Sequence, residues 1–582
     1  MTALRSAEKF VADFHGEGQR MGLDELRSVE DVLVAVLPLI RRSRNSFCPI
    51  NRFAPELLVY IFQHTLDDVR YGSDMFIWPS ATLRSTQGLI NLTRICHHWR
   101  EICLSAHALW GHIIYDFELG ISFKKPASYL TRSVRAPLKV YLYGDTMDEY
   151  VQRMLDSDGA RIKELHIHST TDAWSYLTAF PAPSLEHLTL HVRTPQLVTR
   201  DGGLVPAQMP STSGRSAQTA LFQDNTPHLK VLSLHSASYL PRNHFPSLTH
   251  LCLRAPSLRR GGAAHLLGFP DVAWTLSDLR AFLVDCPVLE ELILAEIAAQ
   301  IRSDDEALPT VPLTRLRRFA LGNTPTELLV WFARHIEMPG DVAIRIFGPA
   351  PHSASRLAQI LPHLPLPHEP HIMLLEDSES YFADPILTVS IASASSGIQI
   401  HFVLYRDDTR WDSSVWRLFP FADIHELHVR PRRYLHVFTD IASLIERLPL
   451  LSTLVCGYAP ENQNVLGTIL ARLSPSPERP AMHCPALKTL HVFIGSSGEM
   501  LSNVVDFAAA RADVGYPLRR VIIEQDPDIH DEWHGTSEFH DKVLRIREQV
   551  ESIEVRAYDG IAPRVDWPAV CTSGTHKYWP DW

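Results

Sequence analysis

The chain has few cysteines and no long hydrophobic run. Eight cysteines among 582 residues include no Cys-x-x-Cys pair, which excludes a disulfide framework and a zinc-finger type of site. The most apolar early stretch, Asp31 to Ile40, is about ten residues long and contains Pro38, so it is too short to cross a membrane. The charged start of the chain does not form a secretory signal. We therefore expect an intracellular protein, cytoplasmic or nuclear, with no membrane partner.

Excess positive charge and catalytic signatures are also missing. Lys and Arg total 55 against 66 Asp and Glu, a net charge of −11, which disfavours a nucleic-acid partner. There is no phosphate-binding loop, nucleophile elbow or zinc-protease motif. Neither His166-x-His168 nor His97-His98 has a Cys or carboxylate at zinc-ligand spacing. We expect no catalytic residue, metal site or cofactor; a hydrolase site assembled from distant residues stays an open alternative.

The first 47 residues carry a helical pattern. Leu26, Val29, Leu33 and Val36 follow a 3-4-3 spacing, which places them on one helical face. Pro38 predicts that the helix ends or kinks there, because proline disfavours helix at the residue before it. Two interpretations remain: a short coiled coil, or a helix that packs on the following domain, which we favour.

Residues 48–115 form a second helical block. Pro55 suits the first turn of a helix, and Leu57, Leu58, Ile61 and Phe62 then recur at helical spacing. Leu92 to Cys103 has the same spacing and predicts one further helix, and a short third helix carries Leu109 and Trp110. The Gly, Ser, Pro and Thr content of residues 71–88 predicts a loop between the first two helices.

This block resembles an F-box, the module that docks a protein onto a Skp-family adaptor of a cullin ubiquitin ligase. Residues 53–58 resemble its Leu-Pro-x-Glu-Leu turn into a helix, Ile61-Phe62 its Ile-Phe pair, and residues 95–100 its Val-Cys-x-x-Trp-Arg helix; Leu109-Trp110 is similar to its Leu-Trp close. The prefix at residues 49–52 resembles that of fungal members. The resemblance implies an adaptor-binding surface, and Leu58→Asp as a variant that abolishes binding. The implied residues are Pro49, Ile50, Phe53, Pro55, Glu56, Leu57, Leu58, Ile61, Phe62, Cys96, Trp99, Arg100, Leu109 and Trp110.

From about residue 130 a Leu-x-x-Leu-x-Leu rhythm recurs. Its sharper form, Pro-x-Leu-x-x-Leu-x-Leu/Val, begins at Pro183, Pro227, Pro246, Pro287 and Pro485. The rhythm resembles the strand portion of leucine-rich repeats. Ten segments follow it: Ile162–Ile167, Leu185–Leu190, Leu229–Leu234, Leu248–Leu253, Leu289–Leu294, Leu316–Leu321, Ile424–Val429, Leu451–Cys456, Leu487–Val492 and Leu518–Ile523.

The spacing of these segments is uneven. A Gly/Ser/Pro/Thr/Gln-rich stretch within residues 196–226 predicts a disordered insertion. Residues 330–420 match the rhythm poorly, although Val342–Ile346, Ile386–Ile391 and Ile398–Val403 still predict strands. Whether the repeats continue through this region is left open.

The sequence thus predicts an α/β chain: a helical segment (1–47), an F-box-like domain (48–115), an irregular leucine-rich-repeat solenoid (130–555) and a C-terminal tail (556–582). The solenoid is expected to be horseshoe-like with strands on its concave face, and the tail, with Trp567, to dock on the last repeat as a cap.

The resemblance implies a substrate-recognition subunit of a Skp-cullin-F-box ubiquitin ligase, which is not itself an enzyme. The F-box would bind the adaptor and through it a cullin-RING ligase, and the repeats would hold an unknown target protein. The alternative is a leucine-rich-repeat scaffold with no ligase partner. Outward positions of the strands predict the target-binding residues His187, His250, Glu291, His425, His428, Lys488 and His491.

Overall fold

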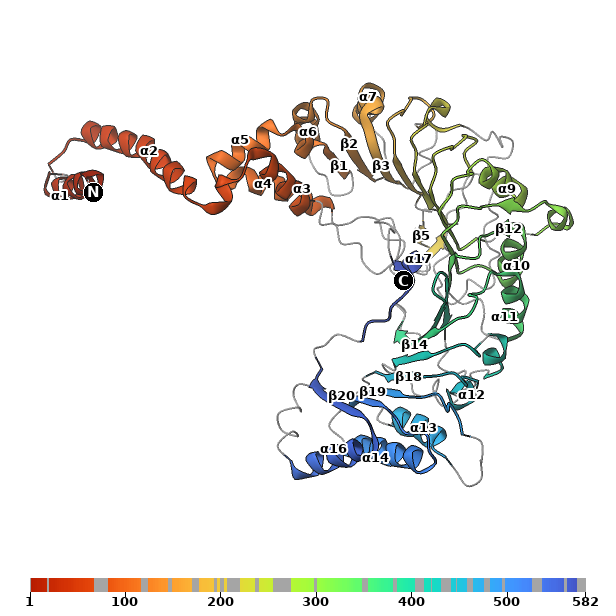
Figure 1. Ribbon diagram of the computed structural model, residues 1–582. Coiled ribbons are helices and arrows are strands. Elements are labelled where there is room, and N and C mark those ends of the chain that lie inside the picture. The colour runs from red at the N-terminus through yellow and green to blue at the C-terminus, as the bar shows by residue number, and fades with distance from the viewer. Residues whose placement is uncertain are drawn as a thin grey trace. The chain divides into compact units, whose positions relative to one another are not determined.

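The computed structural model divides the chain into two compact units, Met1–Tyr143 and Gly144–Trp582, which are described separately. The protein is of the mixed α/β type and contains a long, mostly parallel sheet (Figure 1). The structure describes residues 2–17, 20–66, 82–116, 124–144, 149–169, 177–192, 196–198, 204–206, 220–235, 240–254, 274–297, 301–347, 354–379, 385–403, 413–419, 421–430, 441–445, 447–457, 464–475, 482–494, 498–525, 536–558 and 563–572.

The N-terminal unit is mostly helical and ends in a parallel pair of strands, β1 and β2. Leu138, Val140 and Leu142 of β2 are buried in it. Its elements are α1 (Thr2–Glu17), α2 (Leu23–Ser46), η1 (Pro49–Arg52), α3 (Pro55–Leu66), α4 (Thr82–Ile95), α5 (His97–Ser105), η2 (His107–Trp110), β1 (His112–Asp116), α6 (Lys124–Ser133) and β2 (Leu138–Tyr143).

Three helix boundaries differ from the sequence prediction. Helix α2 continues through Pro38, and none of its residues is buried; water can therefore take the carbonyl that proline leaves without a donor. The predicted helix from Leu92 to Cys103 is two helices, because Cys96 has an extended backbone and its thiol accepts the N–H of Trp99 as an N-cap. Helix α4 begins at Thr82, so residues 82–88 of the predicted loop are helical; residues 71–81 lie outside the described residues.

The C-terminal unit is built on the long sheet. Each of the ten Leu-x-x-Leu-x-Leu segments overlaps a strand, as predicted. The three segments predicted as strands between residues 330 and 420 do so as well. The strands are β3 (Ile162–Ser169), β4 (His187–Val192), β7 (Val231–His235), β8 (His250–Arg254), β9 (Glu291–Ala295), β11 (Arg318–Gly322), β13 (Ala343–Phe347), β14 (Ile372–Glu379), β15 (Pro385–Ala392), β16 (Gly397–Val403), β17 (Glu426–Arg430), β18 (Thr453–Cys456), β19 (Thr489–Ile494), β20 (Arg520–Gln525) and β21 (Ser552–Ala557).

The proline of the sharper motif forms a turn before the strand. The N–H of Leu185 bonds the carbonyl of Ala182, and the same bond joins Leu248 to Phe245. Proline occupies the second position of these turns, where its fixed φ is favourable. The leading leucine is then buried and the strand begins two residues later. This repeated turn is the physical origin of the Pro-x-Leu pattern.

The sheet is parallel and follows chain order from β3 to β13 and from β17 to β21. Between these runs the order is inverted. Strand β13 pairs with β16, the antiparallel β16, β15 and β14 follow, and β14 then pairs with β17 in parallel. The sheet is therefore continuous through residues 330–420, and within the described residues it does not close into a barrel.

Helices cover one side of this sheet. In Figure 1, α9 to α13 follow one another along that side. Buried leucines and isoleucines at alternate strand positions, such as Leu188, Leu190 and Ile344, form the core. The helices are α7 (Glu149–Asp158), α9 (Leu276–Val284), α10 (Thr326–His335), α11 (Ala354–Ile360), α12 (Ile441–Ile445), α13 (Asn464–Leu473), α14 (Gly498–Asp513), α16 (Ser537–Gln549) and α17 (Ala569–Thr572).

Short elements complete the unit: the 3-10 helices η3 (Gly159–Arg161), η4 (Leu221–Asp224), η5 (Ser303–Ala307), η6 (Leu361–His363) and η7 (Ser413–Leu418), and the strand pairs β5 (Gln196–Val198) with β6 (Leu204–Pro206) and β10 (Val311–Pro312) with β12 (Ile336–Glu337). No helix among the described residues combines the length and apolar character that a membrane crossing needs.

Two sequence expectations about the C-terminal unit were wrong in part. The predicted disordered insertion (196–226) contains the β5–β6 hairpin, and its end is ordered because Leu221 and Phe222 are buried; residues 199–203 and 207–219 lie outside the described residues. Of the C-terminal tail, only its start lies against the last repeats, where the ring of Tyr558 is 5.0 Å from that of Phe493 and its N–H bonds the carbonyl of Gln525; residues 563–572 do not cap them. Instead, Val570 and Cys571 form a buried cluster with Ala343 of β13.

Candidate functional site

Four of the fourteen predicted adaptor-binding residues form the core of the N-terminal unit. Leu58, Phe62, Leu109 and Trp110 are buried. The ring of Phe62 lies 4.7 Å from that of Trp99, centroid to centroid. The indole N–H of Trp110 donates to the carbonyl of Cys103 at 2.7 Å. These side chains hold the helices together and cannot reach a partner.

Three others are exposed apolar residues, Ile50, Phe53 and Leu57, which we call the α3 surface. Their side chains are 37, 48 and 54% exposed, respectively. All three lie between the start of η1 and the first turn of α3. Of the remaining predicted residues, Pro49, Pro55, Glu56 and Arg100 are exposed, and Ile61, Cys96 and Trp99 are half-buried.

A hydrogen bond fixes η1 against α5. The indole N–H of Trp99 donates to Oδ1 of Asn51 at 2.6 Å, and the amide of Asn51 donates to the carbonyl of Asn45 at 2.7 Å. The residues before α3 are therefore held in place by side chains far along the chain. The sequence resemblance pointed to Trp99 but not to Asn51 as its partner.

The burial of Leu58 changes which substitution tests docking. The sequence suggested Leu58→Asp, but an aspartate there would place a charge in the core and unfold the unit. Leu57, its exposed neighbour, is the appropriate position. The choice between them could not be made from helical spacing, since both positions belong to one apolar run.

The second candidate is the side of the sheet opposite the core, which we call the strand face. Side chains of successive residues on a strand point to opposite sides, so the residues that alternate with the core leucines share this face. In register they run Glu164, His187, Val231, His250, Glu291 and Arg318 across β3 to β11. Three of the predicted target-binding residues, His187, His250 and Glu291, thus lie in one row.

Charges in this row pair within the sheet. Arg318 forms a hydrogen-bonded ion pair with Glu291, and the two side chains are 2 and 1% exposed. Nε2 of His250 lies 3.3 Å from the same carboxylate. Glu291 therefore lies beneath the surface and acts on a partner only through its neighbours. The sequence analysis missed Arg318, although its place two residues after Leu316 in the repeat marks it as a strand-face position.

A histidine row lies four residues further along the strands on the same face. His168, His191 and His235 are register partners on β3, β4 and β7. Their ring centroids are 4.5 and 5.5 Å apart in sequence order. Burial first, and then His191, Arg254 and His168, lower the pKa of His235 well below its usual value. Each histidine follows the last apolar residue of its repeat, a signal that could have been read from sequence.

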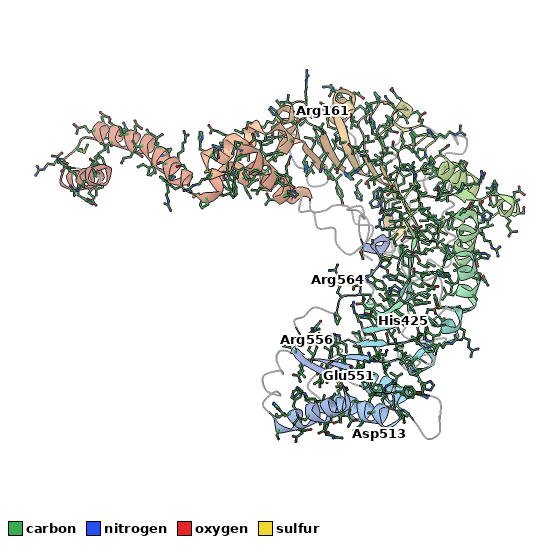
Figure 2. All side chains as sticks on the ribbon, in the orientation of Figure 1. Arg161, His425, Asp513, Glu551, Arg556 and Arg564 are labelled. Atoms are coloured by element: carbon green, nitrogen blue, oxygen red, sulfur yellow. The ribbon has the colours of Figure 1, made fainter. Side chains whose placement is uncertain are left out.

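Predicted target residues near the C-terminal end of the strand face are paired as well. Nε2 of His428 bonds Glu426 two residues earlier on β17. Nε2 of His491 lies 3.0 Å from Glu524, which also binds Arg556 through two guanidinium nitrogens. Burial is the main cause that lowers the pKa of His491. Arg556, labelled in Figure 2, lies on β21.

The last two predicted target residues do not belong to the strand face. His425 and Lys488 each precede a strand by one residue and are exposed (Figure 2 labels His425). Nδ1 of His425 lies 3.1 Å from the carbonyl of Leu450. They belong to a charged rim in which Glu186 bonds both Lys163 and Lys230; the bond to Lys163 is the main cause that lowers the pKa of Glu186.

No group of three or more His, Cys, Asp or Glu with metal-binding geometry occurs among the described residues. A comparison of the sequence with models of known protein families gives no match, and a search of curated proteins gives none either.

Proposed function

We propose that this protein is a substrate-recognition subunit of a Skp-cullin-F-box type of ubiquitin ligase. The α3 surface binds the Skp-family adaptor, and the strand face of the C-terminal unit binds a target protein. The contribution of this chain to ubiquitin transfer is proximity, since it holds the target near the ubiquitin-loaded enzyme.

The main support for the proposal is that α3 has apolar residues on a buried side and also on an exposed side. Leu58 and Phe62 complete a core, while Ile50, Phe53 and Leu57 leave apolar area in water. Covering such side chains is favourable by roughly 25 cal/mol per Å² of apolar area. An apolar groove on a partner is the fitting occupant, as in other cases in which a helix lies in a groove.

The C-terminal unit supports the second half of the proposal. Strands of similar motif, nine of the ten preceded by a turn of the same kind, pair in chain order in two runs, β3 to β11 and β17 to β20, with helices on one side. This is the arrangement expected of irregular leucine-rich repeats, which present their strands as an extended binding surface.

Co-purification of the full chain with a Skp-family adaptor tests the first half. Leu57→Asp should abolish co-elution without unfolding the protein, because an acidic residue in the first turn of a helix is favourable. Leu104→Asp on α5 is the matched control, since Leu104 is 42% exposed and lies outside the α3 surface. It should co-elute like the wild type. A wild-type chain that never binds the adaptor would refute the proposal.

The scaffold alternative has one observation in its favour. The N-terminal unit ends in its own parallel strand pair, β1 with β2, of the kind that repeats use. A cap should be required for the solubility of the repeats, whereas an F-box should be removable. Residues 144–582 expressed alone separate the two: a soluble protein with one cooperative thermal transition supports the F-box assignment, and aggregation supports the cap.

A further inference from the structure

The C-terminal segment at residues 563–571 crosses the strand face, where the proposed function places a target. The carbonyl of Val570 accepts the Nε–H of Arg318 on β11 at 2.7 Å. The carbonyl of Pro563 accepts a bond from Arg430 on β17. Arg318 is the register partner of Ala343, and both alternate with core residues, Phe319 and Ile344. The segment is therefore on the side of the sheet opposite the core.

The span of the segment fits a chain that runs perpendicular to the strands. From β17 to β11 the sheet order is β17, β14, β15, β16, β13, β11, which is about 24 Å at roughly 4.8 Å per spacing. From Pro563 to Val570 an extended chain covers about 23 Å. The segment turns at Trp567, whose N–H bonds the carbonyl of Val565, and enters α17 at Ala569. The long side chains of Arg318 and Arg430 therefore supply part of the reach.

From Arg564 to Trp567 the side chains of the segment alternate between the solvent and the sheet. Val565 is buried and Trp567 is half-buried, whereas Arg564 and Asp566 are exposed; Figure 2 labels Arg564 on this segment. Trp567 packs against the cluster of Ala343, Val570 and Cys571. The face thus holds residues 563–571 by two arginine-to-carbonyl bonds and by the apolar side chains of Val565, Trp567 and Val570. Neither kind of contact depends on the segment being part of this chain.

We propose that the strand face over β11, β13 and β17 is a binding surface for a short apolar segment of the target, and that residues 563–571 occupy it until the target replaces them. The chemistry of the partner is inferred from the segment that lies there now: a stretch of about eight residues with several apolar side chains, one of them aromatic, and two backbone carbonyls that accept from Arg318 and Arg430. This inference deepens the proposed function and rests on its second half only.

Displacement of residues 563–571 can be measured on the unmodified full chain by the alkylation of Cys571. This thiol is 2% exposed, and burial raises its pKa to about 12, so it should be protected from alkylation while the segment is bound. The probe is a synthetic peptide of residues 561–572 with serine in place of its cysteine. Saturating peptide should raise the alkylation rate of Cys571 at least about tenfold, measured by mass spectrometry. An unchanged alkylation rate would show that the peptide does not displace residues 563–571 and would overturn the proposal.

A pair of variants tests the same surface by direct binding. Val565→Asp with Trp567→Asp should release the segment, and the fluorescent peptide should then bind at least about fiftyfold more tightly than to the wild type, whose own segment competes at high effective concentration. Arg564→Ala with Asp566→Ala changes only outward side chains and should bind the peptide as weakly as the wild type does. Equal affinity for wild type and released variant would refute the proposal. Adaptor co-elution is unaffected by either result, so failure here is distinct from failure of the α3 surface.

Discussion

The α3 surface and the strand face differ in where their side chains find partners. Ile50, Phe53 and Leu57 leave apolar area in water, whereas Glu291 and Arg318 on the strand face bond each other within the sheet. An apolar surface gains from any apolar groove that covers it. A surface of internally paired charges gains only from a partner that replaces those bonds or leaves them intact. Under the proposed function, the first surface suits a common adaptor and the second suits a selective target.

The first prediction concerns a charge placed in the core beneath the α3 surface, and tests whether Leu57 and Leu58 differ in burial as the structure shows. Leu58→Asp should destabilise the N-terminal unit by more than about 4 kcal/mol, because it removes a buried leucine and buries a carboxylate. Leu57→Asp should change the free energy of unfolding by less than about 0.5 kcal/mol. Chemical denaturation followed by circular dichroism measures both. Similar losses in the two variants would show that Leu57 is also a core residue.

The second prediction removes one charge from the strand face. Arg318→Met leaves Glu291 buried without its main partner and should cost about 3–5 kcal/mol. Adding Glu291→Leu should recover part of that loss, because no buried charge is then left alone. Arg317→Met, one residue earlier and exposed, is the control and should be nearly neutral. Additive effects of Arg318→Met and Glu291→Leu in a double-mutant cycle would contradict the pairing.

The sequence could predict these surfaces in part. Strand positions followed from the repeated Pro-x-Leu turn, because that turn is local. The inverted order of β14, β15 and β16 could not be predicted, since it depends on pairings between distant segments. Period-two alternation identified His250 and Glu291 as strand-face candidates, but the burial of Glu291 follows from its register with Arg318. Helical spacing likewise grouped Leu57 with Leu58, and only packing separates them.

Strand β14 was not predicted from the sequence, for a different reason. Its residues Ile372 to Leu375 are all buried and form a short apolar run without alternation, which periodicity alone cannot assign to a strand or a helix. The break at Cys96 was missed because cysteine is not among the residues that usually cap helices. In both cases the deciding interaction is non-local or uncommon.

The third prediction concerns pH and the histidine row. The folded-state pKa of His235 is well below its unfolded value, mainly because of burial, so the unfolded chain binds more protons below pH ~6.5. Stability from this group is therefore complete above that pH and falls by up to about 1.4 kcal/mol per pH unit below it. His235→Gln should remove this part of the slope, measured by urea unfolding between about pH 7.5 and 5.5.

The fourth prediction concerns the N-cap of α5 in the N-terminal unit, and its effect on stability is the smallest of the four. Cys96 caps α5 through its thiol, which accepts the N–H of Trp99 at 3.4 Å, and Trp99 in turn fixes η1 through Asn51. Cys96→Ala should cost about 0.5–1 kcal/mol, whereas Cys96→Ser should be neutral or stabilising, because a hydroxyl is a better cap acceptor than a thiol. Thermal unfolding of the two variants measures the difference. If Ala and Ser behave alike, the thiol is not a cap, and the break between α4 and α5 must be held by the packing of Trp99 against Phe62.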